Sequence, residues 1–356
     1  RLHMQAVYNV HTHSDEFVVE LFVTLDKVHV LVHNLLVIEL WKACVLPHLK
    51  KTLADMDTIS SYMILFQEGS LAGLLGVLLY HTHAVEATTE EYLLELADWT
   101  YRKLTYLNSN QAYAFAELNA DMDVKAMMAQ TPLQELEARI AEMDMAVSLT
   151  SLGILKCLTA AMGSAPMGLL SRLVTTNDTA MALLPLLDRP PWLRRRKGKL
   201  ERFLTDGGMR WAAVDASDRL KLGQYEISLW LALNDLLVEP KARAKYNMDD
   251  WRKDKLLGLK RHLNELVFDQ VPVLKDLQRV LDELALGAGG VDRDQYKQAG
   301  LILEQVPEVR EALQRGRDWR QVAIDQAKTV FRKGQGIDKA RADALSKMLD
   351  QVMQMG

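Results

Sequence analysis

The chain has 356 residues, of which 49% are apolar, and its apolar residues are mostly Leu, Ala and Met rather than Phe or Ile. This composition favours helices, and a chain of this length can bury a large core without disulfides. The formal net charge of -4 excludes a strong global field that would draw the protein to nucleic acid or to an anionic membrane. Only two cysteines are present, Cys44 and Cys157, which indicates a reducing compartment such as the cytosol.

The first part of the chain shows the spacing of amphipathic helices. Apolar residues recur at three and four positions over 15–50, where Pro47 is expected to stop or kink the helix. Further helices are predicted over 59–81 and 90–107, and over a Met- and Ala-rich segment at 111–129. Polar or small residues interrupt the apolar stretches before the ~20 residues that a bilayer span needs, so we expect no membrane partner.

The clearest helix start is the sequence Thr-Pro-Leu-Gln at 131–134. Its threonine can cap the helix, its proline suits the first helical position, and its glutamine can reach back to the cap N–H. A long helix is therefore predicted over 132–162, with a Gly-Ser-Ala-Pro stop after it. Two shorter helices are predicted over 167–174 and 179–187.

The helical periodicity breaks over 189–222. This segment holds two adjacent prolines, a run of basic residues, and an Asp-Gly-Gly turn between short stretches with aromatics at 200–203 and 209–211. We predict an inserted loop or a small β-hairpin. Helical patterns then resume over 227–238, 253–266, 272–286, 299–331 and 338–353.

The predicted fold is all-α. Many short helices, each apolar on one side and joined by links of about two to eight residues, are typical of an irregular armadillo- or HEAT-like repeat, an α-solenoid. No fixed repeat period is visible, so an irregular helical bundle is the alternative. Three regions are expected: an N-terminal helical repeat region at 1–188, the basic loop or hairpin insertion at 189–222, and a C-terminal helical region at 223–356.

Histidines come closest to the pattern of a metal site. H-x-H pairs occur at 11–13 and 81–83, and His29 and His33 have the i, i+4 spacing of helical zinc ligands. No third ligand follows nearby, and residues two apart on a helix point to different faces. Solvated or capping histidines are therefore the favoured interpretation, and we expect neither a metal site nor a cofactor site in this chain.

The glycine spacings, the acidic pairs and the cysteine that could suggest a ligand or catalytic site also have structural interpretations. The glycines spaced over 69–76 match no phosphate-binding loop and favour close helix packing, while those at 287–290 read as a linker. Acidic pairs at 121–123 and 249–250 lie near predicted helix starts, where the helix dipole favours negative charge. Cys157 lies on an apolar helix without a neighbouring His, which indicates a buried thiol rather than a nucleophile. The sequence therefore predicts no catalytic residue and no enzyme activity.

One local concentration of charge lies at the start of the predicted insertion. Its favoured functional interpretation is an electrostatic contact with an acidic partner peptide, and a solvated loop is the structural alternative. RNA or phosphate is less favoured, because the chain has few aromatics that could stack on bases. The candidate partner-binding residues are Trp192, Arg194, Arg195, Arg196, Lys197 and Lys199.

Several short sequence matches follow the order of a known family from Met4 to about Phe331. Together they resemble the helical region of the MYND-type zinc-finger proteins that act as axonemal dynein preassembly factors. The matches include Met4-Gln5-Ala6, Val23-Thr24, Lys27-Val28, Trp41-Lys42, Tyr101-Arg102-Lys103-Leu104-Thr105, Gln134-Glu135-Leu136, Pro191-Trp192, Gly198-Lys199-Leu200, Arg210-Trp211, Lys221-Leu222, Leu236-Leu237 and Leu303-Glu304-Gln305-Val306-Pro307-Glu308.

The resemblance implies a non-enzymatic scaffold or co-chaperone for the preassembly of axonemal dynein arms. The implied location is the cytoplasm of ciliated cells, with the ciliary base as a candidate site. The implied partners are a leucine-rich-repeat dynein assembly factor, the ninety-kilodalton heat-shock chaperone, an immunophilin co-chaperone and dynein chains, without nucleic acid or membrane. The alternative is a generic helical-repeat adaptor whose basic loop binds an acidic partner or nucleic acid.

The family also carries a C-terminal MYND finger that holds two zinc ions through a cysteine-rich cluster. This chain has two scattered cysteines and no such cluster, so the resemblance implies zinc only in the finger and none in this chain. Because the chain begins at Arg1 with a helical pattern close behind, we expect it to be a piece of a longer protein.

Overall fold

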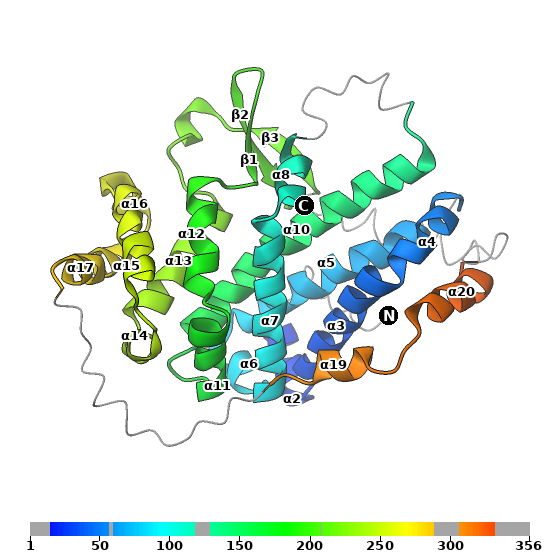
Figure 1. Cartoon of the computed structure of the whole chain (residues 1–356), viewed down its shortest axis with the longest axis horizontal. Coiled ribbons are helices and arrows are strands. Elements are labelled where there is room, and N and C mark those ends of the chain that lie inside the picture. Colours follow the sequence, from blue (N-terminus) through cyan, green and yellow to red (C-terminus); the bar gives the residue numbers. More distant parts are fainter. Residues whose placement is uncertain (1–14, 57–59, 118–128, 207, 288–305, 332–356) are drawn as a thin grey trace.

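The computed structural model describes residues 15–56, 60–117, 129–206, 208–287 and 306–331. These residues form a mostly helical body with one small antiparallel sheet (Figure 1), which confirms the predicted fold class. The predicted helix at 338–353, the first H-x-H pair, the first acidic pair and most of the glycine linker lie outside the described residues.

The apolar stripe predicted over 15–50 forms three helices rather than one. The chain turns sharply after the first of them, where Asp26 has a φ of 50°, and the first two helices meet at 92°. A second break comes at Val45, and Pro47 then lies in the first turn of the next helix. Proline is tolerated there because backbone N–H groups in the first turn have no acceptor within the helix. The helices are α2 (Asp15–Thr24), α3 (Val28–Cys44) and α4 (Leu46–Ala54).

The helices predicted over 59–81 and 90–107 agree closely with the structure, and a short helix between them was not predicted. The segment predicted over 111–129 is helical at its start, and its remainder lies mostly outside the described residues. The helices are α5 (Ser60–Leu79), α6 (Thr82–Glu86), α7 (Glu90–Leu107) and α8 (Asn110–Glu117).

The long helix α10 (Pro132–Ala160) is the central element and packs against α5 and α7. Its predicted capping box is present: the Gln134 N–H donates to the Thr131 hydroxyl, and the Thr131 N–H donates to Gln134 Oε1 at 2.9 Å. By length and composition α10 could cross a membrane, contrary to the expectation from the sequence. Of its most apolar window, 72% is buried inside the protein, as in the core helix of a globular fold.

Two shorter elements complete the first half of the chain. The helix predicted over 167–174 changes to π-helical geometry partway, and the next helix agrees with the prediction. The elements are α11 (Met167–Ser171), the π-helix η1 (Arg172–Thr176) and α12 (Thr179–Asp188).

A three-stranded antiparallel sheet in the order β1-β2-β3 interrupts the helices. The predicted hairpin across Asp206 is confirmed, but the basic run before it is not a loop. It forms another strand and a tight turn, which the sequence interpretation missed because charged residues are poor strand formers. The elements are β1 (Leu193–Arg196), β2 (Lys199–Leu204), β3 (Arg210–Ala213) and the 3-10 turn η2 (Ala216–Asp218).

The helix predicted over 253–266 is broken into separate pieces. The chain tightens into a 3-10 turn at Gly258, and Asn264 caps a new helix by accepting a bond from Val267 N at 3.2 Å. The elements are α13 (Gln224–Val238), α14 (Pro240–Lys245), α15 (Asp250–Leu257), η3 (Gly258–Arg261), α16 (Glu265–Gln270) and α17 (Leu274–Ala285).

The last described segment, 306–331, is here named the C-terminal strap. It contains two helices where the sequence predicted one, because Gly316 has a φ of 70° and ends the first of them. The strap lies far from α17, along α3, α4 and α7 (Figure 1, orange). Its helices are α19 (Val309–Gln314) and α20 (Trp319–Thr329).

Buried apolar side chains form one continuous core that extends from Val18 to Phe331. Trp192 and Phe203 of the sheet belong to this core, so the sheet is anchored to the helices. Close helix packing holds at Gly69, where an added Cβ would lie 3.1 Å from Met143 Cε. It does not hold at Gly73 and Gly76, which have no such neighbour within 4 Å. The division of the chain into three regions stays a prediction.

Candidate functional site: a basic hairpin and a buried polar network

Arg194, the first arginine of the basic run, is held inside the hairpin. Its Nε donates to Glu201 Oε2 at 2.8 Å across the strand pair. Its guanidinium also lies over the ring of Trp211, 4.1 Å from the ring centroid, and donates to the backbone oxygen of Ala116 at 3.3 Å. The pair is well buried, with 9% of the Arg194 side chain exposed and 16% of that of Glu201. Arg194 therefore fixes the hairpin on α8.

Trp192 anchors the base of the same hairpin to α13. Its side chain is fully buried, its ring lies 6.0 Å from that of Tyr225, and its Nε1 donates to Glu226 Oε1 at 3.0 Å. Arg202 of β2 lies 3.4 Å from the same carboxylate oxygen. Trp192 is thus part of the core and cannot contact a partner while the hairpin is folded.

The remaining basic residues, here named the basic tip, are Arg195, Arg196, Lys197 and Lys199. Arg195, Lys197 and Lys199 are exposed, and Arg196 is half-buried with an Nε atom that has no hydrogen-bond partner. Within the part of the chain that the structure describes, no acidic side chain forms an ion pair with any of the four. The structure thereby separates the predicted partner-binding residues into two that hold the hairpin and four that remain open to a partner.

Arg194→Ala is expected to loosen the hairpin and leave the helical body folded. Loss of a largely buried charge-assisted bond and of the contact with Trp211 should lower the local stability by about 2 kcal/mol. Hydrogen exchange over 193–213 should accelerate while exchange in α10 stays unchanged. Unchanged exchange in both regions would show that the Arg194 contacts do not support the hairpin.

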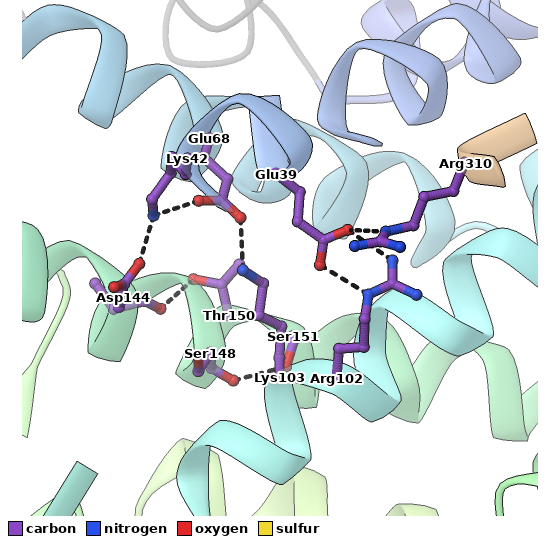
Figure 2. A network of polar contacts seen from close by, with 11 residues as sticks. Glu39, Lys42, Glu68, Arg102, Lys103, Asp144, Ser148, Thr150, Ser151 and Arg310 are labelled. Carbon is purple, nitrogen blue, oxygen red and sulfur yellow. Dashed lines mark hydrogen bonds and ion pairs between the residues drawn. The ribbon is translucent and has the colours of Figure 1, made fainter. Parts of the chain in front are cut away.

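A buried network of charges lies where α3, α5, α7 and α10 meet (Figure 2). At its centre Glu68 is 0% exposed and accepts hydrogen bonds from Lys42 Nζ and Lys103 Nζ, both at 2.6 Å. Lys42 also donates to Asp144 Oδ1 at 2.5 Å. Burial by itself raises the pKa of Glu68, but the two ammonium groups outweigh burial and lower it from 4.5 to about 2. The Glu68 carboxylate is therefore charged at neutral pH.

A second cluster beside it ties the C-terminal strap to the N-terminal helices (Figure 2). Glu39 accepts from Arg102 Nε at 2.9 Å and Nη2 at 2.7 Å, and from Arg310 Nε at 3.2 Å. The backbone N–H of Arg310 donates to Glu95 Oε1 at 2.8 Å, and burial raises the pKa of that carboxyl. Farther along the strap, Trp41 Nε1 donates to Gln326 Oε1 at 2.8 Å. Arg310 thus links the strap to the carboxylates of both Glu39 and Glu95.

The sequence interpretation missed both clusters, although a signal was present. Glu39 and Glu68 each stand in a long apolar stretch of a predicted helix, at positions where a buried face would normally carry an apolar residue. A buried acid of this kind needs a basic partner, but the sequence pattern does not identify which residue that partner is.

The histidines lie apart from both clusters. His29 Nδ1 is 3.4 Å from Asp26 Oδ1, His83 Nε2 is 3.5 Å from Glu20 Oε1, and the rings of His81 and His83 are 5.8 Å apart. Among the described residues, no group of three or more His, Cys, Asp or Glu side chains is placed to hold a metal ion.

The other two groups singled out in the sequence have the structural roles predicted for them. Asp249 caps α15 by accepting a bond from Arg252 N at 2.7 Å. Cys157 is buried, and burial raises the pKa of its thiol.

These features define a class: an all-α protein of irregular stacked helices that carries one basic hairpin. No family model matches the chain, and no solved structure matches it. The chain is similar to the zinc finger MYND domain-containing protein 10 homolog of Drosophila melanogaster, with 27% identity over 354 residues that cover 97% of this chain and 74% of the relative. The resemblance drawn from the sequence is thereby confirmed, because the similarity extends over nearly the whole chain.

Proposed function

We propose that the protein is a non-enzymatic scaffold, acting as a co-chaperone in the cytoplasmic preassembly of axonemal dynein arms in ciliated cells. The observation that carries this proposal is the similarity to a zinc finger MYND domain-containing protein 10 homolog over 97% of the chain. The role in dynein preassembly comes from the family resemblance.

A scaffold role is supported by the combination of one continuous core with peripheral elements that can meet partners. One core runs through the helices, and the buried charges around Glu68 fix how α3, α5, α7 and α10 pack. The basic tip and the strap lie at the edge of this body. The proposed partners are a leucine-rich-repeat assembly factor, the ninety-kilodalton heat-shock chaperone, an immunophilin co-chaperone and dynein chains. The role needs neither a cofactor nor a membrane.

Removal of the protein from ciliated cells should abolish dynein arms and motility, because dynein chains that are not preassembled do not reach the axoneme. Electron microscopy of axoneme cross-sections checks this expectation, with re-expression of the full-length protein as the control that restores the arms. Normal arms and normal beating in cells that lack the protein would refute the proposed role.

A generic helical-repeat adaptor is the second candidate. It is favoured by one observation, the four basic side chains of the basic tip without an acidic partner among the described residues. An adaptor of this kind would bind its partner through the hairpin in any cell type, and its loss would leave dynein arms intact.

A further inference from the structure

We propose that the basic tip, Arg195, Arg196, Lys197 and Lys199, is a docking site for an acidic segment of a partner protein. This inference rests on the proposed function only in that the protein acts by binding other proteins. It adds the place on the fold and the chemistry of the partner.

The tip concentrates positive charge around a two-residue turn. Arg196 and Lys199 are directly opposite each other in the β1–β2 pair, and Lys197 lies in the turn between them. Like charges that face each other across an antiparallel pair repel and weaken it. A partner carboxylate placed between these side chains would remove the repulsion, so the arrangement favours an anionic ligand.

The backbone conformation of the turn is a second unfavourable feature. Lys197 has a φ of 47° and Gly198 a φ of 75°, the left-handed pair of a type I′ hairpin turn. Asn or Gly is strongly preferred at the first of these positions, and a lysine there is disfavoured by its Cβ. Residues held in such conformations cluster at functional sites. A lysine at this position adds positive charge to the basic tip but lowers the stability of the turn.

Arg196 offers a donor that is already desolvated. Its Nε atom is buried and has no hydrogen-bond partner among the described residues. A buried donor without a partner is unfavourable, and hydrogen bonds from a guanidinium to a carboxylate are among the strongest that proteins form. If the Arg196 side chain turned outward toward an acidic side chain, this donor would gain a partner.

The surroundings favour a protein segment over a nucleic acid. Proteins that bind single strands combine basic grooves with aromatic rings on which bases stack. Here the rings of Trp192 and Phe203 are buried, and Arg194 covers that of Trp211. The net charge of -4 also opposes a polyanion as long as RNA. The glutamates or aspartates of a flexible protein segment can bind by pairing with the cations of the basic tip and require no exposed aromatic rings.

A labelled peptide tests the proposal on the whole chain. Fluorescence anisotropy of a fluorescein-labelled peptide of eight glutamates should show binding to the intact chain that weakens as salt is raised. A variant with Arg195→Gln, Arg196→Gln, Lys197→Asn and Lys199→Gln should bind at least about tenfold more weakly, since each exposed ion pair contributes about a two- to fivefold change. The matched control removes four exposed cations elsewhere, with Lys27→Gln, Arg219→Gln, Lys275→Gln and Arg320→Gln, and should bind like the intact chain.

The single change Lys197→Asn separates binding from folding. Asn suits the left-handed turn better than Lys, so the melting temperature should stay the same or rise, while peptide binding falls about two- to fivefold. Equal binding by the intact chain and by the neutralised variant would overturn the proposal. So would tighter, tip-dependent binding of an oligomer of eight uridines. Because the assay uses purified protein, its failure would leave the test in ciliated cells unaffected.

Discussion

Glu68→Gln is expected to lower the free energy of unfolding by about 3 to 5 kcal/mol, the usual effect of removing one partner from a buried charge network. Gln keeps the volume of the side chain but leaves Lys103 without its carboxylate, and Lys42 with Asp144 alone. Equilibrium unfolding in urea at pH 7 measures the change. The control is Glu137→Gln, whose exposed pair with Lys50 should contribute less than about 1 kcal/mol.

The same carboxylate predicts how stability depends on pH. A folded-state pKa of about 2, against 4.5 for the free side chain, means that the unfolded state binds the proton more readily. The contribution of Glu68 is therefore fully present above pH 4.5 and is lost as the pH falls toward 2, by roughly 3 kcal/mol in all. The Gln variant should lack this part of the acid transition. If its stability fell with pH as steeply as that of the intact protein, Glu68 would not be the group responsible.

Arg310→Ala is expected to loosen the C-terminal strap while the rest of the protein stays folded. The substitution removes the charged bond to Glu39, whereas the backbone bond to Glu95 and the packing of the strap against the core remain. Loss of a hydrogen bond to a charged group should lower the stability of the attached strap by roughly 2 kcal/mol, which corresponds to roughly thirtyfold faster hydrogen exchange. Exchange measured by mass spectrometry over 306–331 tests this prediction.

Arg315→Ala provides the control within the same segment. Arg315 pairs with Glu311 at the surface, where 71% of the Arg315 side chain and 61% of the Glu311 side chain are exposed. Exchange in the strap should therefore change little. If both variants accelerated exchange to the same extent, the bond between Arg310 and Glu39 would have no special role in attaching the strap.

Features that depend on neighbours in the sequence could be predicted. The capping box at Thr131 needs residues three apart, α7 follows from the periodicity of its own apolar side chains, and the turn before β3 follows from Gly208. Each of these features is determined within a few residues, so the sequence pattern was sufficient for helix starts, helix faces and one hairpin.

Features that depend on distant residues could not be predicted. β1 pairs with β2, and its Arg194 contacts Glu201 and Trp211, although the charged residues of this strand favour exposure. Similarly, nothing in the sequence around Glu39 indicates that Arg310 is its partner. Tertiary contacts overrode local propensity at both places, and these are also the places where the structure added most to the candidate site.

The strap has a consequence for the order in which the protein is completed during synthesis. Glu39 and Arg310 are 271 residues apart in the chain. At a translation rate of about 5 to 20 residues per second, Glu39 must wait roughly 15 to 50 s before its last partner leaves the ribosome. During that interval Arg102 can already neutralise the carboxylate, but the sides of α3 and α4 that the strap will cover stay open to other proteins in the cell.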